Sequence, residues 1–178
     1  MKTLLKITVV LMALLPATLS AQKSPVDKLF DKYSGEDGFT SVDIAKGLFE
    51  LFSDIEADDP EFDSFKKAVE GIESLKLLAY SVKDGSEGSK QKFYNDIKKS
   101  VPYGEYDELM VIKDKDARIN FYAKSDKQVI TEMLMVVDGD DKAVLLSLIG
   151  NIDLNNVAKL GSSMNLEGME YLGKMKRE

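Results

Sequence analysis

Two neighbouring segments of the chain, residues 129–138 and 142–149, are apolar on both sides of an extended strand. Successive side chains of a β-strand point to opposite faces of the sheet. The large apolar residues of the first segment fall into both alternating sets, Met133, Met135 and Val137 in one and Leu134 and Val136 in the other. The second segment shows the same property. A sheet that is apolar on both faces must be covered on both, so other parts of the chain must lie on each side of these strands.

Four consecutive strands are predicted in the second half of the chain, at 106–113, 118–124, 129–138 and 142–149. Short polar turns separate them, and Asp138-Gly139 is a typical hairpin dipeptide. Strands joined by such short connections pair antiparallel, because a parallel pair needs a long crossover connection. We therefore expect an antiparallel meander.

The rest of the chain shows the spacing of amphipathic helices, interrupted by two further strands. Ser24 followed by Pro25 is typical of a helix start. Helices are predicted at 24–33, 45–52, 59–72 and 89–100 and from Asp153 onward, and strands at 39–44 and 75–82. The last helix would carry Leu154, Val157, Leu160 and Met164. The predicted fold is α+β, a single domain in which an antiparallel β-meander sheet is packed with about five helices.

The covering of the meander bears on function. Helices are expected to cover one face entirely. The second face is either covered by other helices or left partly open as a groove, and exposed apolar patches usually mark interaction sites. The residues that would line such a groove are Met110, Ile112, Met133 and Met135. The outward-facing set stays open at this point, because a one-residue register shift exchanges the two faces.

The N-terminus has the features of a secretory signal. Lys2 and Lys6 form a basic start, an apolar run follows, and small residues lead to Ala21. We expect cleavage after Ala21, with Ser20 as the alternative site. The expected organisation is a signal peptide at 1–21, one domain at 22–165 and a C-terminal tail at 166–178. The mature protein is expected to be periplasmic, without stable membrane insertion.

Composition removes several classes of function. The 178 residues contain no His and no Cys, which excludes Ser-His catalysis, Cys/His zinc sites and a lipidated N-terminal cysteine. Removing residues 1–21 takes away two of the 24 basic residues and none of the 31 acids, so the mature net charge falls from −7 to −9. Such an acidic chain is not expected to bind nucleic acid, which needs a basic surface. No cofactor is predicted.

Two acidic clusters fail the spacing of a calcium loop. Counted from Asp54, the sixth residue is Asp59 where glycine is required, and the twelfth is Phe65 where glutamate is required. The cluster around Asp138 and Asp140 has Ile149 at its twelfth position. We interpret the first cluster as a solvated loop with favourable charge at a helix start and the second as a hairpin turn. No metal site is predicted.

Two serines, Ser64 and Ser89, match the Ser-x-x-Lys pattern of penicillin-binding enzymes. That chemistry also needs Ser-Asp-Asn and Lys-Thr-Gly motifs, which the mature chain lacks. Neither serine is therefore predicted to be catalytic, and no catalytic residue is proposed.

Several stretches along the chain resemble one known family. They are Leu29–Tyr33, Gly38–Ile44, Tyr106–Met110, Glu132–Val136 and Ser147–Leu154 with Leu160. Together with the signal sequence they resemble the domain-of-unknown-function family 4252, small exported proteins of Gram-negative bacteria. The resemblance covers nearly all of the mature chain and implies export, one compact domain and no assigned activity.

Two functions remain. The favoured one is a non-enzymatic periplasmic module that binds another envelope protein or an apolar ligand through one sheet face. The alternative is a carboxylate- or serine-based hydrolase acting on cell-envelope material, which would need ionisable groups gathered in a pocket.

Overall fold

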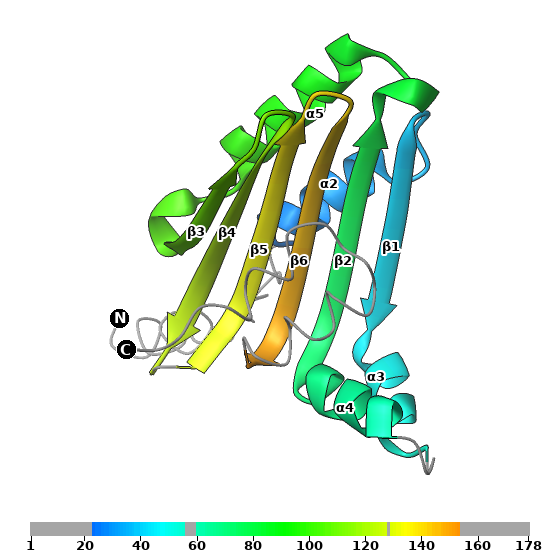
Figure 1. The fold of residues 1–178 in the computed structure, drawn as a ribbon, viewed down its shortest axis with the longest axis vertical. Helices are drawn as coiled ribbons and strands as arrows, with labels where there is room; N and C mark the ends of the chain where they lie inside the picture. Colours follow the sequence, from blue (N-terminus) through cyan, green and yellow to red (C-terminus); the bar gives the residue numbers. More distant parts are fainter. Residues whose placement is uncertain (1–22, 56–59, 128, 154–178) are drawn as a thin grey trace, which may run out of the picture.

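The chain folds around one antiparallel sheet of six strands (Figure 1). The structure is a computed structural model, and it describes residues 23–55, 60–127 and 129–153. The strands are β1 (Phe39–Ala45), β2 (Ile72–Ser81), β3 (Asp107–Lys113), β4 (Ala117–Asp126), β5 (Val129–Gly139) and β6 (Lys142–Ile152). Their spatial order is β1-β2-β6-β5-β4-β3. The α+β class and the four-strand meander are thereby confirmed, and β2 with β1 extends the meander beyond β6.

Four α-helices lie within the described residues, where the sequence predicted about five in all. They are α2 (Pro25–Tyr33), α3 (Lys46–Ser53), α4 (Pro60–Val69) and α5 (Glu87–Ser100). The described residues also form two short 3-10 helices, η1 (Val82–Asp84) and η2 (Tyr103–Glu105). The predicted helix that follows Asp153 lies outside the described residues.

The predicted helix at 59–72 ends earlier than its apolar spacing suggested. It stops at Val69, and Ile72 already begins β2. Gly71 lies between them with a positive φ of 84°, which favours glycine. A Cβ at Gly71 would lie 2.6 Å from the carbonyl oxygen of Asn151, so the close approach of β6 also demands glycine here. Ile72 is therefore a strand residue rather than the last member of a helical stripe.

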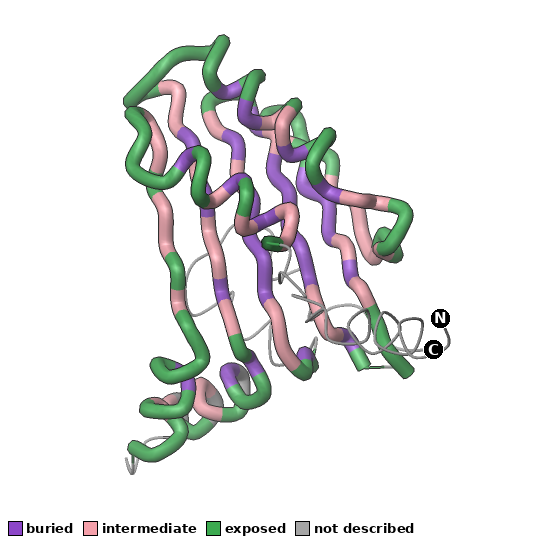
Figure 2. The backbone as a smooth tube through the Cα atoms, turned by 180° about the vertical axis from the view of Figure 1, so that it is seen from behind, coloured by how far each residue is buried: buried purple, intermediate pink, exposed green. Residues whose placement is uncertain are grey.

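Helices α2 and α5 lie together on one side of the sheet, which we call the helix face (Figure 2). Rings from three elements meet there: Phe39 of β1 lies 4.8 Å from Tyr33 of α2 and 4.9 Å from Phe93 of α5, measured between ring centroids. Leu134, Val136 and Leu145 of the central strands pack into the same cluster. One apolar set of β5 and β6 is thus buried beneath two amphipathic helices.

The helix face is also held by charged contacts between helix and strand. Lys90 of α5 is buried, and its ammonium group donates to the carbonyl oxygens of Gly139 at 2.8 Å and Asp140 at 3.0 Å, in the β5–β6 turn. Lys76 of β2 lies 2.6 Å from the Asp27 carboxylate in the first turn of α2. These contacts join α2 and α5 to the sheet at defined positions.

The Asp27 contact predicts a pH dependence of stability. The hydrogen bond from Lys76 lowers the pKa of Asp27 below its ordinary value of 3.8. A depressed carboxylate pKa contributes stability that is complete above the unfolded-state value and is lost as the pH falls through the folded-state value. Between about pH 5 and about pH 2, Asp27→Asn should therefore show a smaller loss of unfolding free energy than the unmodified protein.

Urea unfolding monitored by circular dichroism at several pH values measures this difference. Asp37→Asn is the matched control, because Asp37 is an exposed residue of the α2–β1 turn. Equal acid dependence in the unmodified protein and in Asp27→Asn would contradict the assignment.

Candidate functional site

The four residues predicted to line a groove lie on one face of the sheet, opposite the helix face. We call it the apolar face. Met110 and Ile112 come from β3, and Met133 and Met135 come from β5. All four belong to one hydrophobic cluster. Met133 is 0% exposed and Met135 is 3% exposed, whereas Met110 and Ile112 are only partly buried.

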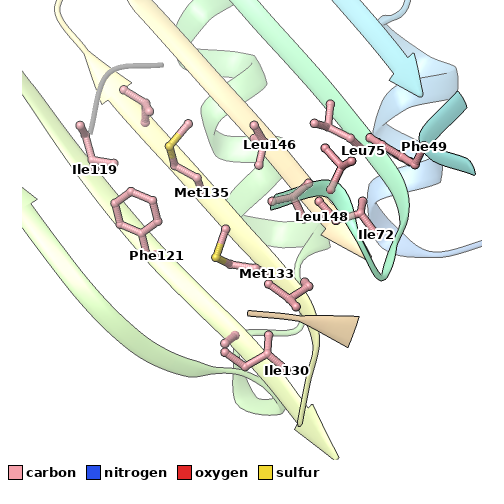
Figure 3. Close-up of a cluster of buried hydrophobic side chains, with 14 residues drawn as sticks. Phe49, Ile72, Leu75, Ile119, Phe121, Ile130, Met133, Met135, Leu146 and Leu148 are labelled. Carbon is pink, nitrogen blue, oxygen red and sulfur yellow. The ribbon is translucent and has the colours of Figure 1, made fainter. Parts of the chain in front are cut away.

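The register of the six strands places apolar side chains next to one another on this face. On one side of an antiparallel pair, directly opposed residues lie close together and form the packing unit of a sheet. One row of such residues crosses all six strands: Met110, Phe121, Met135, Leu146, Leu77 and Val42. A second row contains Ala123, Met133, Leu148, Leu75 and Ile44. Figure 3 shows the large side chains of both rows on the same side of β4, β5 and β6. The result is a continuous apolar surface, with methionine and phenylalanine at its centre.

The described helices cover only one end of this surface. Phe49 of α3 and Val69 of α4 pack against it and are buried, with Phe65 of α4 beside them. Figure 1 shows these two helices at the lower end of β1 and β2, while α2 and α5 lie behind the sheet. Among the residues that the structure describes, no helix therefore lies over β4 and β5 on this side.

On the other side of the same strands lies a small polar cluster that bears on the hydrolase alternative. Tyr106 donates from its hydroxyl to Glu132 at 2.9 Å, and the buried Ser147 lies 3.5 Å from the second carboxylate oxygen. Burial, reinforced by the bond to Glu132, raises the pKa of Tyr106, so this residue stays a hydrogen-bond donor. Glu132 already accepts from Tyr106, and Ser147 is enclosed, so we interpret the cluster as a structural link between β5, β6 and the residue after η2.

Acidic side chains gather around the cavity between α3 and the start of β2. It encloses about 280 Å³, and its lining includes Glu50, Glu70, Glu73 and Ser53. The three carboxylates are exposed, and Glu50 pairs with Lys46 at 3.1 Å. The Ser53 hydroxyl donates to the carbonyl oxygen of Phe49 at 3.2 Å, within its own helix. The carboxylates here are exposed, and the Ser53 hydroxyl is hydrogen-bonded to the backbone of its own helix rather than to a general base. The cavity therefore lacks the arrangement that would activate a serine nucleophile.

The Ser-x-x-Lys serines and the acidic clusters, which the sequence analysis did not assign to catalysis or metal binding, lie partly within the described residues. Ser89 lies in the first turn of α5, where its backbone amide donates to the capping hydroxyl of Ser86 at 3.2 Å. The side chain of Ser64 and residues 56–59 of the first acidic cluster lie outside the described part. Within that part, no group of three or more acidic residues could hold a metal ion.

Sequence reasoning missed one exposed apolar feature. Leu48, Leu51 and Ile55 lie on the outer side of α3 and just beyond it, and Leu51 is 64% exposed. Their spacing of three and four residues was a usable signal. Phe49 of the same helix is buried, at 6% exposed, so α3 carries apolar side chains on both its inner and its outer side.

Comparison with known proteins gives one family match, to a family without an assigned activity. A family model, Domain of unknown function (DUF4252), matches residues 33–160, well over half of the chain. No curated protein and no solved structure matches the chain. Within the described residues, no helix has the length and apolarity needed to cross a membrane.

The two faces of β5 should respond differently to a buried charge. Val136→Glu places a carboxylate beneath α2 and α5, where an unpaired charge is costly, and we expect it to lower the unfolding free energy by more than about 3 kcal/mol. Met135 is as buried as Val136, at 3% exposed, but no described helix lies over β5 on its side, so we expect Met135→Glu to cost clearly less.

Chemical denaturation of both variants, each at neutral pH, measures the difference. Severe and equal destabilisation would mean that both faces are permanent core, and a binding role for the apolar face would be wrong.

Proposed function

We propose that this chain, which belongs to the DUF4252 family, is an exported, non-enzymatic binding module whose apolar face receives an amphipathic helix of another envelope protein. One observation carries the proposal. A row of large apolar side chains crosses all six strands, and the described helices cover only one end of this row.

The shape of the surface favours a helix over a small apolar ligand. Ligand sites are usually enclosed cavities lined mainly by apolar groups, and among the described residues the cavity beside α3 is small and bordered by exposed carboxylates. An amphipathic helix instead lays one apolar stripe along a surface. Methionines such as Met133 and Met135 suit such a contact, since their flexible side chains adapt to different partners.

Charge defines the partner further. The chain has 24 basic and 31 acidic residues, so a partner helix with lysine or arginine on its polar side is favoured electrostatically. Charge attraction between exposed groups weakens with salt, whereas apolar burial does not. The two contributions can therefore be separated by measuring affinity at low and high ionic strength.

A pair of variants on β3 tests the use of the apolar face. Ile112 lies on that face, and Val111 precedes it on the opposite side of the same strand, across from Asn120. The probe is a synthetic leucine/lysine peptide of about 18 residues with helical spacing, compared with a peptide of equal composition in alternating order. Ile112→Glu should weaken binding of the helical peptide at least tenfold, and Val111→Glu should change it less than about twofold.

Fluorescence anisotropy with labelled peptide gives both affinities, at low salt and in the presence of salt. Equal binding of the two peptides, or equal effects of the two variants, would contradict the proposed surface. If the two variants differ as expected, a photo-crosslinking residue at position 112 in intact cells would identify the natural partner.

Export supplies a separate test. The basic start, apolar run and small residues before Gln22 support removal of residues 1–21. Intact-mass measurement of the protein recovered from a periplasmic extract should show a chain beginning at Gln22. A chain that retains Met1–Ala21 and stays in the membrane fraction would contradict export in this form.

A further inference from the structure

We infer that residues 154–178 of the same chain dock on the apolar face over β4, β5 and β6 and occupy it in the absence of a partner. The inference rests on the proposed function for its regulatory meaning, because a segment on this surface would compete with a partner helix. The docking itself rests on observations about the chain alone.

The first observation is that the centre of the apolar face is buried. Phe121 and Met133 are 0% exposed and Met135 is 3% exposed. The described helices on this side, α3 and α4, lie at the end of β1 and β2 (Figure 1). Something other than these helices must therefore exclude solvent from β4 and β5.

The second observation is where the described chain ends. Ile152 is the last residue of β6, and it is itself a buried member of the apolar cluster. The chain thus leaves the sheet beside the surface that needs a cover. The 178-residue chain continues for 25 residues after Asp153. A helix rises about 1.5 Å per residue, so even half of this length would cross three strands spaced about 4.8 Å apart.

The third observation is the pattern of these residues. Asp153 is a good helix N-cap, and Val157, Leu160 and Met164 follow at intervals of three and four residues. Lys159 falls between them, on the polar side of such a helix. The segment therefore has the character proposed for the partner: one apolar stripe and a polar back. The DUF4252 match also continues to residue 160, eight residues past the end of β6, so the family unit includes the start of this segment.

A single-cysteine experiment on the mature full-length protein tests the docking. The chain has no cysteine of its own, so Met135→Cys introduces one thiol at the centre of the apolar face. We expect this thiol to react slowly with Ellman's reagent in the native protein. Adding Leu160→Glu should release the segment and accelerate the reaction at least tenfold, because a charge on the apolar stripe opposes burial. Lys159→Glu is the matched control and should leave the rate within about twofold.

The outcomes separate the possible covers. Equal rates in all three proteins would overturn the inference. Protection that disappears on dilution and does not respond to Leu160→Glu would show a second copy of the chain on this face, and would also overturn it. Circular dichroism of each variant verifies that the sheet remains folded, so that fast reaction cannot come from global unfolding.

The peptide assay distinguishes docking from its regulatory meaning. If the segment is a competitor, Leu160→Glu should increase affinity for the helical leucine/lysine peptide several-fold, and Lys159→Glu should not. Acceleration of thiol reactivity without any gain in peptide affinity would uphold docking and overturn the proposed binding function. Loss of both effects would overturn docking itself.

Discussion

The pairing of β5 with β6 is the constraint on which the rest of the structure depends. Both strands carry large apolar side chains on both faces, and antiparallel pairing aligns these sets so that each side of the sheet centre is apolar. Burial of apolar area dominates the favourable free energy of folding, so neither face can be left to solvent. The helix face satisfies this requirement with α2 and α5, which bury Leu134, Val136 and Leu145. The apolar face satisfies it in a different way, and that difference is the basis of the proposed function.

The two faces differ in the kind of contact that holds their cover. On the helix face, packing is accompanied by directional contacts: the buried Lys90 binds the β5–β6 turn, Lys76 pairs with Asp27, and Asp96 accepts from Lys32 and Tyr33. Such contacts specify one position for each helix and are costly to break when buried. On the apolar face, the described contacts are almost entirely those of aliphatic, methionine and phenylalanine side chains. Apolar packing without polar anchors tolerates exchange of one apolar cover for another, as a binding surface requires.

Much of this arrangement could be predicted from the sequence because it depends on local patterns. Short polar turns predicted the four-strand meander, and strand parity predicted that Met110 and Ile112 share one face of β3 and that Met133 and Met135 share one face of β5. The register of the strands then places both pairs on the same face of the sheet. The position of β2 beside β6 could not be predicted, since it joins strands separated by α5 and three other strands. The end of α4 was misplaced for a similar reason. Helical spacing extended to Ile72, but the approach of Asn151 to Gly71, which is a contact between distant residues, turns the chain into β2.

The sequence by itself determined the approximate positions of the described helices and strands, the antiparallel order of β3 to β6, and the need for cover on both sides of the sheet. These follow from side-chain periodicity and from connection lengths, which are properties of neighbouring residues. Tertiary structure alone decided which set of β5 side chains faces the helices: Leu134 and Val136 face α2 and α5, and Met133 and Met135 face away. Both sets are equally apolar, so local pattern could not distinguish them. The choice was made by the register of β5 against its neighbours and by the side on which α2 and α5 cross the sheet, and a shift of one residue would have exchanged the two faces.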